Sequence, residues 1–342
     1  MGEAAPFIDI PTMRIVTLGK TGSGKSSLAN TLFEEEETFK VNDSANSETK
    51  SCQSKNKIIN GINVQLVDTP GFFDTDKQKY TKLKHELLKC IIDCAPGPHA
   101  FLLTLKVEKF TSQEQAIVDQ MIECFSEEAL KFTTVMFTHG DQLPKGKKIE
   151  ECVKENKGLN DLVQKCGGRC HVIDNKYWNK DQDDPYRNNQ HQIEQLLETI
   201  KKTIEENKGN CFTNEMLLKV ELMKESERDR IIQSSPGISE ELLNKAVNES
   251  VFTKRKKNWV GVAVGTVLGA LLTAFLAPEL LVLGAAAGVG TAGVGLLGGV
   301  TGGVVSEKSK AVSEAMESKA QKLLAHVKTS SVKYKELVKS HK

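Results

Sequence analysis

The stretch GKTGSGKSS, residues Gly19–Ser27, decides what kind of fold this chain adopts. It contains the pattern G-x-x-x-x-G-K-[ST], which runs from Gly19 to Ser26. The short apolar run Arg14–Leu18 precedes it and predicts a buried strand, while Ser27–Phe33 has helical character. A glycine loop between a strand and a helix is typical of a phosphate-binding loop, because the backbone N–H groups and the helix N-terminus both point at the anion.

Two side chains of the pattern carry specific chemistry. We expect Lys25 to reach the β- and γ-phosphates of a nucleotide, and Ser26 to ligate Mg²⁺. The alternative is a glycine-rich turn with an incidental Lys-Ser pair. The strand before the loop and the helix after it favour the phosphate-binding loop.

Length and composition limit the remaining possibilities. The 342 residues are enough for a full α/β domain and a further segment. The chain has 46 Lys and Arg against 45 Asp and Glu, a formal net charge of +1, which argues against a general nucleic-acid binder because such proteins are usually strongly basic. Residues 1–12 predict a loose leader without the features of a secretory signal. We expect all eight cysteines to be reduced cytosolic thiols, because a nucleotide-binding domain works where nucleotide is present.

From Met13 to about Lys208, short apolar runs alternate with amphipathic segments. The predicted strands are Arg14–Leu18, Lys57–Ile59, Val64–Val67, Ala100–Leu105, Thr133–Phe137 and His171–Ile173. The predicted helices are Ser26–Phe33, Tyr80–Cys94, Ser112–Phe125, Ile149–Lys165 and Asn188–Glu205. This alternation predicts an α/β fold with a mostly parallel sheet and helices on both faces. Such sheets bind ligands at the carboxyl ends of their strands, where the phosphate loop also lies.

A second motif, Asp68-Thr69-Pro70-Gly71, directly follows the predicted strand Val64–Val67. A carboxylate at this strand end can hold Mg²⁺ through water, and the Gly71 amide can face the γ-phosphate. The alternative is a Pro-Gly turn, but the glycine loop about 40 residues earlier favours a nucleotide site. Phe72 and Phe73 stand near the position where Ras-like enzymes place a water-orienting Gln, so we expect slow intrinsic turnover unless a partner supplies a group.

A third motif, Thr138-His139-Gly140-Asp141, follows the predicted strand Thr133–Phe137. Asp141 can accept hydrogen bonds from the guanine N1–H and N2–H₂ groups, which adenine does not offer in that arrangement. The alternative is a His-Gly-Asp turn. His139 could stack on the base or reach a partner subunit, or it could be an ordinary loop histidine. Asn175 follows the next strand, and its amide could either touch guanine or cap the next turn.

Together these residues resemble the AIG1-type GTPases, the family of GTPases of immunity-associated proteins. The resemblance covers roughly residues 13–208. The fourth of the matching segments is the most specific, because a generic GTPase has no reason to carry it. The segments are GKTGSGKSS (19–27), ETKSCQ (48–53), DTPGFFDT (68–75), GPHAFLLTLKVEKFTSQEQ (97–115), FTHGDQL (137–143) and CHVIDN (170–175).

The resemblance implies a Ras-like fold that binds GTP or GDP with Mg²⁺. It places the following residues around the phosphates: Gly19, Lys20, Thr21, Gly22, Ser23, Gly24, Lys25, Ser26 and Ser27. Thr49, in the long polar loop after the first helix, would be the switch residue that closes on Mg²⁺ and the γ-phosphate. Ser26, Thr49 and Asp68 would then surround the metal, and Lys25, Thr49 and Gly71 would serve catalysis.

For the base, the resemblance implies that Asp141 selects guanine and that Asn175 lies beside it. His139-Gly140 stands where many GTPases carry Lys-x or Asn-Lys next to the specificity Asp. Family behaviour also implies GTP-dependent dimerisation through the nucleotide face.

The second half of the chain has a different character. Residues 209–257 are charged and have helical spacing, with a break at Ser234-Ser235-Pro236-Gly237, where one helix should end and another begin near Ser239. This segment is either a linker that folds back on the first domain or a solvated stalk.

Residues 258–305 predict a membrane hairpin. Trp259–Val305 contains a single charged residue, Glu279, which is adjacent to Pro278. The stretch is too long for one span of about 20 residues and fits two, Trp259–Ala277 and Leu280–Val305. Basic residues flank both ends, so we expect both ends to face the cytosol. The alternatives are a buried soluble helical pair, a disordered glycine-rich stretch, or a hairpin that enters one leaflet.

Residues 306–342 predict a basic amphipathic tail, which lies either on a membrane surface or free in solvent. The whole chain is therefore expected to be a guanine-nucleotide switch on the cytosolic face of an intracellular membrane or lipid droplet. It would either hydrolyse GTP with dimerisation completing the site, or act as a GTP-gated scaffold with negligible hydrolysis. A soluble adenine-nucleotide ATPase is a third possibility, but it leaves Asp141 without a role.

Overall fold

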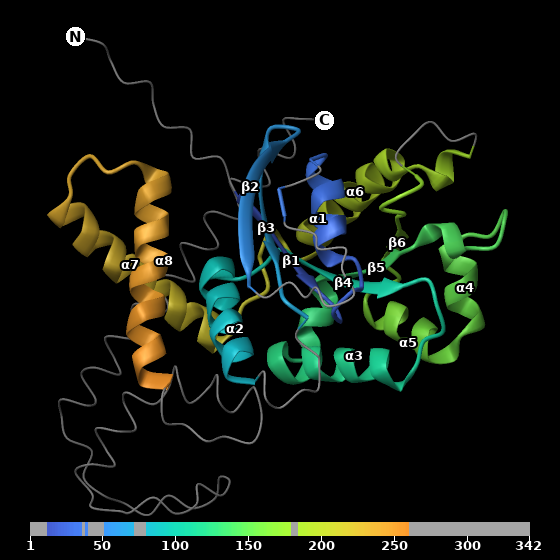
Figure 1. Ribbon diagram of the computed structural model, residues 1–342, viewed down its shortest axis with the longest axis horizontal. Coiled ribbons are helices and arrows are strands. Elements are labelled where there is room, and N and C mark those ends of the chain that lie inside the picture. Colours follow the sequence, from blue (N-terminus) through green and yellow to red (C-terminus); the bar gives the residue numbers. More distant parts are fainter. Residues whose placement is uncertain (1–11, 36–37, 40–50, 72–79, 179–183, 260–342) are drawn as a thin grey trace, which may run out of the picture. The chain divides into compact units, whose positions relative to one another are not determined.

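The computed structural model describes residues 12–35, 38–39, 51–71, 80–178 and 184–259. They belong to two compact units, one up to Leu217 and the other from Leu218. The first unit is built on a six-stranded sheet with the order β2-β3-β1-β4-β5-β6 (Figure 1). Its strands are β1 (Thr12–Leu18), β2 (Gln53–Ile59), β3 (Ile62–Asp68), β4 (Ala100–Lys106), β5 (Thr133–Thr138) and β6 (Cys170–Val172).

Neighbouring strands of the sheet are parallel except β2 and β3, which are antiparallel. The prediction of a mostly parallel sheet is therefore confirmed. The antiparallel pair is joined by Asn60-Gly61, where both residues have positive φ, 49° and 75°, as a tight hairpin requires. This pairing extends β2 back to Gln53 and shortens the predicted loop after the first helix.

The α-helices of the described residues mostly match the predicted ones. They are α1 (Lys25–Phe33), α2 (Tyr80–Cys94), α3 (Ser112–Phe125), α4 (Ile149–Glu155), α5 (Lys157–Lys165), α6 (Asn189–Glu206), α7 (Glu215–Ser234) and α8 (Glu240–Trp259). The part of the chain that the structure describes also contains three short 3₁₀ helices, η2 (Glu127–Phe132), η3 (Gly140–Gln142) and η4 (Pro185–Arg187). The single helix predicted over Ile149–Lys165 is wrong, because Asn156 ends α4 and caps α5 by accepting a hydrogen bond from Leu159 N at 3.0 Å.

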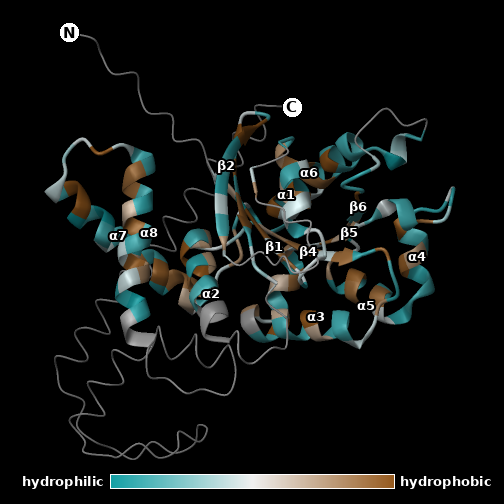
Figure 2. Ribbon diagram, in the orientation of Figure 1, coloured by the Kyte–Doolittle hydropathy of each residue, from teal (hydrophilic) through white to brown (hydrophobic). Residues whose placement is uncertain are grey.

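Helices cover both faces of the sheet, as the sequence predicts. Alternate residues of β4 point to opposite faces: Leu102 belongs to the core shared with α1 and α6, whereas Phe101 contacts Phe125 of α3 and also Phe212, with ring centroids 5.1 and 5.4 Å apart. Figure 1 shows α1 and α6 on one side of the sheet and α2 and α3 on the other. Figure 2 shows hydrophobic residues along the central strands, where full burial of each Leu or Phe contributes about 1.5–3 kcal/mol.

One expectation about the cysteines is wrong. The structure joins Cys52, just before β2, to Cys90 of α2 in a disulfide, with their Cα atoms 5.8 Å apart. The two residues are separated by 38 positions in the sequence, and only the packing of α2 beside β2 brings them together. Among the other cysteines whose side chains the structure describes, Cys94, Cys152, Cys166, Cys170 and Cys211 are not disulfide-bonded.

In the second unit, α7 ends at Ser234 and α8 begins at Glu240, which confirms the predicted break between two helices. Within this unit Glu227 of α7 accepts a hydrogen bond from Ser250 Oγ at 2.7 Å and pairs with Lys254, both on α8. None of the described helices is long and apolar enough to cross a membrane. Apart from Trp259, the predicted spans Trp259–Ala277 and Leu280–Val305 and the tail lie outside the described residues.

Candidate nucleotide-binding site

The glycine loop connects β1 to α1 at the carboxyl edge of the sheet. Gly19 has φ +146°, and a Cβ there would lie 2.5 Å from the Thr104 carbonyl oxygen, so this position needs glycine. Leu28 N donates to Gly24 O at 2.8 Å and starts the helix. The loop therefore leads directly into a helix N-terminus, the element that attracts phosphate.

The ammonium group of Lys25 lies over the loop. Lys25 Nζ donates to Gly19 O at 3.0 Å and to Lys20 O at 2.8 Å, and the residue is 5% exposed. Two backbone carbonyls of the glycine loop thus hold a buried cation. Inside the same loop, Ser23 Oγ is buried and has no hydrogen-bond partner among the described residues, so its hydroxyl can bind a ligand.

A hydroxyl and a carboxylate meet beside Lys25. Ser26 Oγ donates to Asp68 Oδ2 at 2.5 Å, and Thr17 Oγ1 donates to Asp68 Oδ1 at 2.9 Å. Asp68 is fully buried at the end of β3, and burial raises the pKa of its carboxyl. Hard oxygen donors of this kind are the ligands that Mg²⁺ prefers, so the Ser26–Asp68 pair fits the predicted metal. Thr49, the third predicted ligand, lies outside the described residues.

Gly71 lies against the glycine loop. A Cβ on Gly71 would clash with Thr21 Oγ1 and approach Thr21 N to 2.7 Å, so only glycine permits this close contact. The structure therefore brings the second motif to the first across 50 residues of sequence, as the interpretation of Asp68–Gly71 requires.

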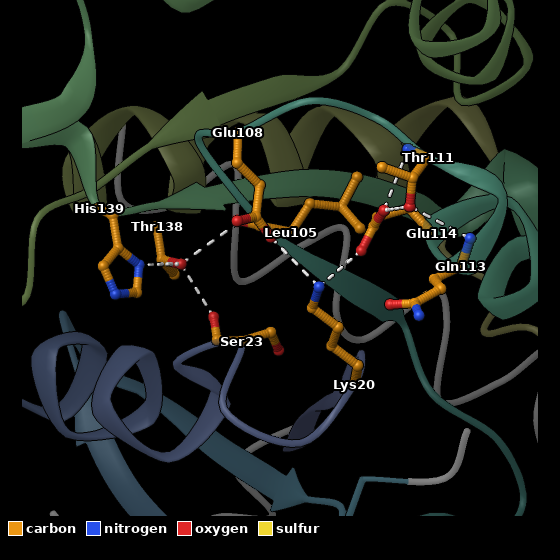
Figure 3. Close-up of polar contacts among 9 residues, drawn as sticks. All are labelled: Lys20, Ser23, Leu105, Glu108, Thr111, Gln113, Glu114, Thr138 and His139. Carbon is orange, nitrogen blue, oxygen red and sulfur yellow. Dashed lines mark hydrogen bonds and ion pairs between the residues drawn. The ribbon is translucent and has the colours of Figure 1, made fainter. Parts of the chain in front are cut away.

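The third motif is joined to the same loop through Thr138. Thr138 Oγ1 donates to Ser23 O at 2.8 Å and lies 3.0 Å from His139 Nδ1 (Figure 3). His139 is half-buried and has φ +61°, a backbone conformation that few side chains other than glycine adopt. Gly140 N donates to Ile173 O at 3.0 Å, which ties the loop after β5 to the end of β6.

Asp141 is exposed, and its backbone N–H donates to Asp174 Oδ2 at 3.1 Å. The other oxygen of Asp174 accepts from Lys176 N at 2.9 Å and Tyr177 N at 2.6 Å. A hydrogen bond between the side chains of Asp141 and Asp174 raises the pKa of the Asp141 carboxyl. Burial alone would raise the pKa of Asp174, but its hydrogen bonds with Asp141 and with these backbone groups hold it below its ordinary value.

Asp174 is a positioning residue that the sequence did not single out. It caps the turn after β6, one of the two roles that remained open for Asn175. Asn175 Oδ1 instead accepts from Thr31 Oγ1 of α1 at 3.1 Å, and a Cβ on Gly24 would lie 3.2 Å from Asn175 Nδ2. Asn175 therefore lies beside the glycine loop.

The side chain of Lys20 is directed to carboxylates outside the glycine loop. Its side chain pairs with Glu114 at 2.7 Å and with Glu108 at 3.2 Å (Figure 3). Glu114 is another residue that sequence reasoning missed, although Thr111-x-x-Glu114 is a recognisable capping box at the start of a helix.

Most of the predicted site residues gather at one edge of the sheet. Those that the structure describes there are Gly19, Lys20, Thr21, Gly22, Ser23, Gly24, Lys25, Ser26, Ser27, Asp68, Gly71, His139, Asp141 and Asn175. They follow β1, β3, β5 and β6, whose parallel pairings align their carboxyl ends. The arrangement places a cation, a hydroxyl–carboxylate pair and a second carboxylate along the edge of the sheet at which folds of this type bind ligands.

Known proteins of similar sequence belong to families of nucleotide-binding proteins and GTPases by their names. The model of the AIG1 family matches residues 13–231. GTPase IMAP family member 8 of Mus musculus is 31% identical over 174 residues, which are 50% of this chain and 25% of that protein. Immune-associated nucleotide-binding protein 13 of Arabidopsis thaliana is 25% identical over 204 residues, 59% of each chain. The chain thus spans a quarter and about three fifths of the length of these two relatives.

Among solved structures, Toc33 from Arabidopsis thaliana in complex with GDP and Mg²⁺ is similar, with a TM-score of 0.44 and 18% identity. The match covers 57% of this chain and 85% of that one.

Proposed function

Because the chain belongs to the AIG1 family, we propose that it binds GTP and GDP with Mg²⁺ and hydrolyses GTP slowly. One observation carries this proposal. A buried Lys25 ammonium, held by loop carbonyls, and the hydrogen-bonded Ser26–Asp68 pair lie at the same carboxyl edge of the sheet. The names of the relatives, a GTPase and a nucleotide-binding protein, support the same conclusion.

Each residue of the site then has a physical task. Lys25 and the loop N–H groups compensate the phosphate charge, and Gly71 lets its strand end approach the loop closely. Ser26 and Asp68 hold Mg²⁺, which when bound neutralises charge on the phosphate oxygens. Asp141 accepts from the guanine N–H donors, while Asp174 orients the loop that carries it. Thr49 would be a further ligand of the metal, and His139 and Asn175 would support the base.

The proposed rate of hydrolysis follows from the residues after Gly71. Phe72 and Phe73 cannot orient a water molecule by hydrogen bonding, since neither carries a polar side-chain atom. A second copy of the chain that docks on the nucleotide face could supply the missing group. The competing function is a GTP-gated scaffold with negligible hydrolysis, and the slow turnover expected from Phe72 and Phe73 is compatible with it.

Dimer-dependent hydrolysis predicts a rate per molecule that rises with protein concentration. We expect single-turnover GTP hydrolysis by the full chain to accelerate across a concentration series from about 1 to 100 µM, the range in which weak protein pairs form. Lys25→Ala is the control that separates this activity from a contaminating phosphatase. A rate that stays flat and negligible supports the scaffold, whereas a flat but measurable rate excludes a contribution from a second copy.

We also propose that residues 259–305 anchor the protein in an intracellular membrane or lipid droplet, with both ends in the cytosol. A stretch of 47 residues with one charged side chain supports an apolar environment. The predicted tail 306–342 would lie on the anionic membrane surface.

Deletion of residues 259–305 is therefore expected to move the protein from the membrane pellet to the soluble fraction. GDP binding should be retained, because the candidate nucleotide site lies wholly before residue 176. Fractionation of cell lysates, with GDP affinity measured on the soluble material, checks both parts. A deletion variant that still pellets with membranes would show that the anchor lies elsewhere.

A further inference from the structure

Glu114 belongs to α3 but reaches the glycine loop. Its Oε1 accepts from Lys20 Nζ at 2.7 Å, while its Oε2 accepts from Thr111 N at 3.0 Å and also from Thr111 Oγ1 (Figure 3). One carboxylate therefore closes the capping box of α3 and pairs with the second residue of the phosphate loop. It does so while only 4% exposed, so water competes little for either oxygen.

Lys20 connects Glu114 to Lys25, because its side chain contacts the first and its backbone carbonyl contacts the second. While the Lys20 ammonium is held by Glu114, the Lys20 carbonyl accepts from Lys25 Nζ at 2.8 Å and from Ser23 N at 3.2 Å. The side chain and the carbonyl belong to one residue, so an anchored side chain limits how far that carbonyl can move. The carbonyl is in turn one of two that hold the Lys25 ammonium.

We propose that Glu114 is a positioning residue for phosphate binding, which acts through Lys20 to hold the Lys25 ammonium in place. The inference rests on the proposed nucleotide-binding function and adds a residue from α3 to that site. It also assigns Lys20 a role that differs from direct phosphate contact, because its ammonium is directed to α3.

The charges of the pair support this role. Burial opposes the charged form of Glu114, but the hydrogen bonds from Lys20 and Thr111 lower the pKa of the carboxyl to about 2. The hydrogen bond to Glu114 raises the pKa of Lys20. Both groups therefore stay ionised at neutral pH, and the contact is a charge-assisted hydrogen bond.

Glu108 provides a matched comparison. It contacts the same ammonium, but at 3.2 Å and with its side chain 44% exposed, against 5% for Glu114. An exposed ion pair contributes little because water and salt screen it. Glu114, and not Glu108, should therefore control the loop.

The experiment measures GDP affinity of the purified full chain and of Glu114→Gln. Glutamine has one acceptor oxygen where glutamate has two, so it can serve Thr111 or Lys20 but not both. We expect the Kd for GDP to rise about tenfold, the size of one lost charge-assisted hydrogen bond. The ratio of GDP to IDP affinity should not change, since IDP differs from GDP only in the base and the variant leaves Asp141 intact.

Two controls separate positioning from helix capping. Thr111→Ala removes the cap but leaves the Lys20 contact, so it should lower the melting temperature with less than about twofold effect on GDP affinity. Glu108→Gln should also change the affinity less than about twofold. A double variant tests whether Glu114 acts through Lys20. If it does, adding Glu114→Gln to Lys20→Gln should cause no further loss of GDP affinity.

The outcomes are distinct. Unchanged GDP affinity in Glu114→Gln, or equal losses in Glu114→Gln and Thr111→Ala, overturns the inference while the proposed function stands. Additive losses in the Lys20→Gln, Glu114→Gln double variant show that Glu114 does not act through Lys20 and also overturn it. A wild-type chain that fails to bind GDP overturns the proposed function and the inference together.

Discussion

Replacement of Lys25 by alanine is expected to raise the Kd for GDP about 30- to 5,000-fold. Loss of one member of a buried, hydrogen-bonded charge pair costs about 2–5 kcal/mol, which corresponds to that range. Lys25 is 5% exposed, and its ammonium is held by two loop carbonyls at 2.8 and 3.0 Å, so the charge that alanine removes is a buried one. The loss should be at least as large for GTP, because the γ-phosphate adds charge to the ligand.

The measurement is a titration of a fluorescent GDP analogue with the purified full chain in the presence of Mg²⁺. Lys202→Ala is the matched control, because Lys202 lies on α6 with its side chain 66% exposed. Circular dichroism shows whether Lys25→Ala is folded, and a folded variant that binds GDP as tightly as the wild type would remove Lys25 from the phosphate site. Wild-type protein that binds neither GDP nor GTP would contradict the nucleotide-binding proposal itself.

Replacement of Asp141 by asparagine is expected to change the preferred base from guanine to xanthine. Asparagine keeps only one acceptor oxygen, so one of the two charge-assisted hydrogen bonds to guanine is lost and the other loses its charge. At about 1.5–3 kcal/mol for the lost bond, the Kd for GDP should rise at least about tenfold. The asparagine amide offers a donor that matches the 2-oxo group of xanthine, and XDP should therefore bind more tightly than GDP. Asp141 is exposed, so this substitution should leave stability nearly unchanged.

Competition of GDP, XDP and ADP for the same site measures the preference directly. Asp161→Asn, on the exposed surface of α5, is the control with the same change of side chain. An unaltered preference for GDP over XDP would place the base away from Asp141. Tighter binding of ADP than of GDP by the wild type would favour the adenine-nucleotide alternative.

Much of the sheet could be predicted because its signals are local. An apolar run followed by glycine or a polar motif identifies β1, β3 and β5, and alternation with helices predicts that most strands are parallel. The order of the strands in the sheet is known only from the structure. Two predictions failed for physical reasons, the single helix over Ile149–Lys165 and the start of the second strand. Asn156 interrupts a continuous helical pattern because its side chain competes for the backbone N–H of Leu159. The antiparallel extension of β2 depends on pairing with β3, which a polar segment does not reveal by itself.

The sequence by itself determined the glycine loop with Lys25 and Ser26, the motif that begins with Asp68 and the motif that ends with Asp141. Those positions depend on backbone geometry and chemistry that a few adjacent residues encode. Only the tertiary structure decided that Glu114 meets Lys20, that Asp174 holds the Asp141 loop, and that Cys52 is bonded to Cys90. These contacts join residues 33 to 94 positions apart, and such distances become short only when the strands and helices pack around one core.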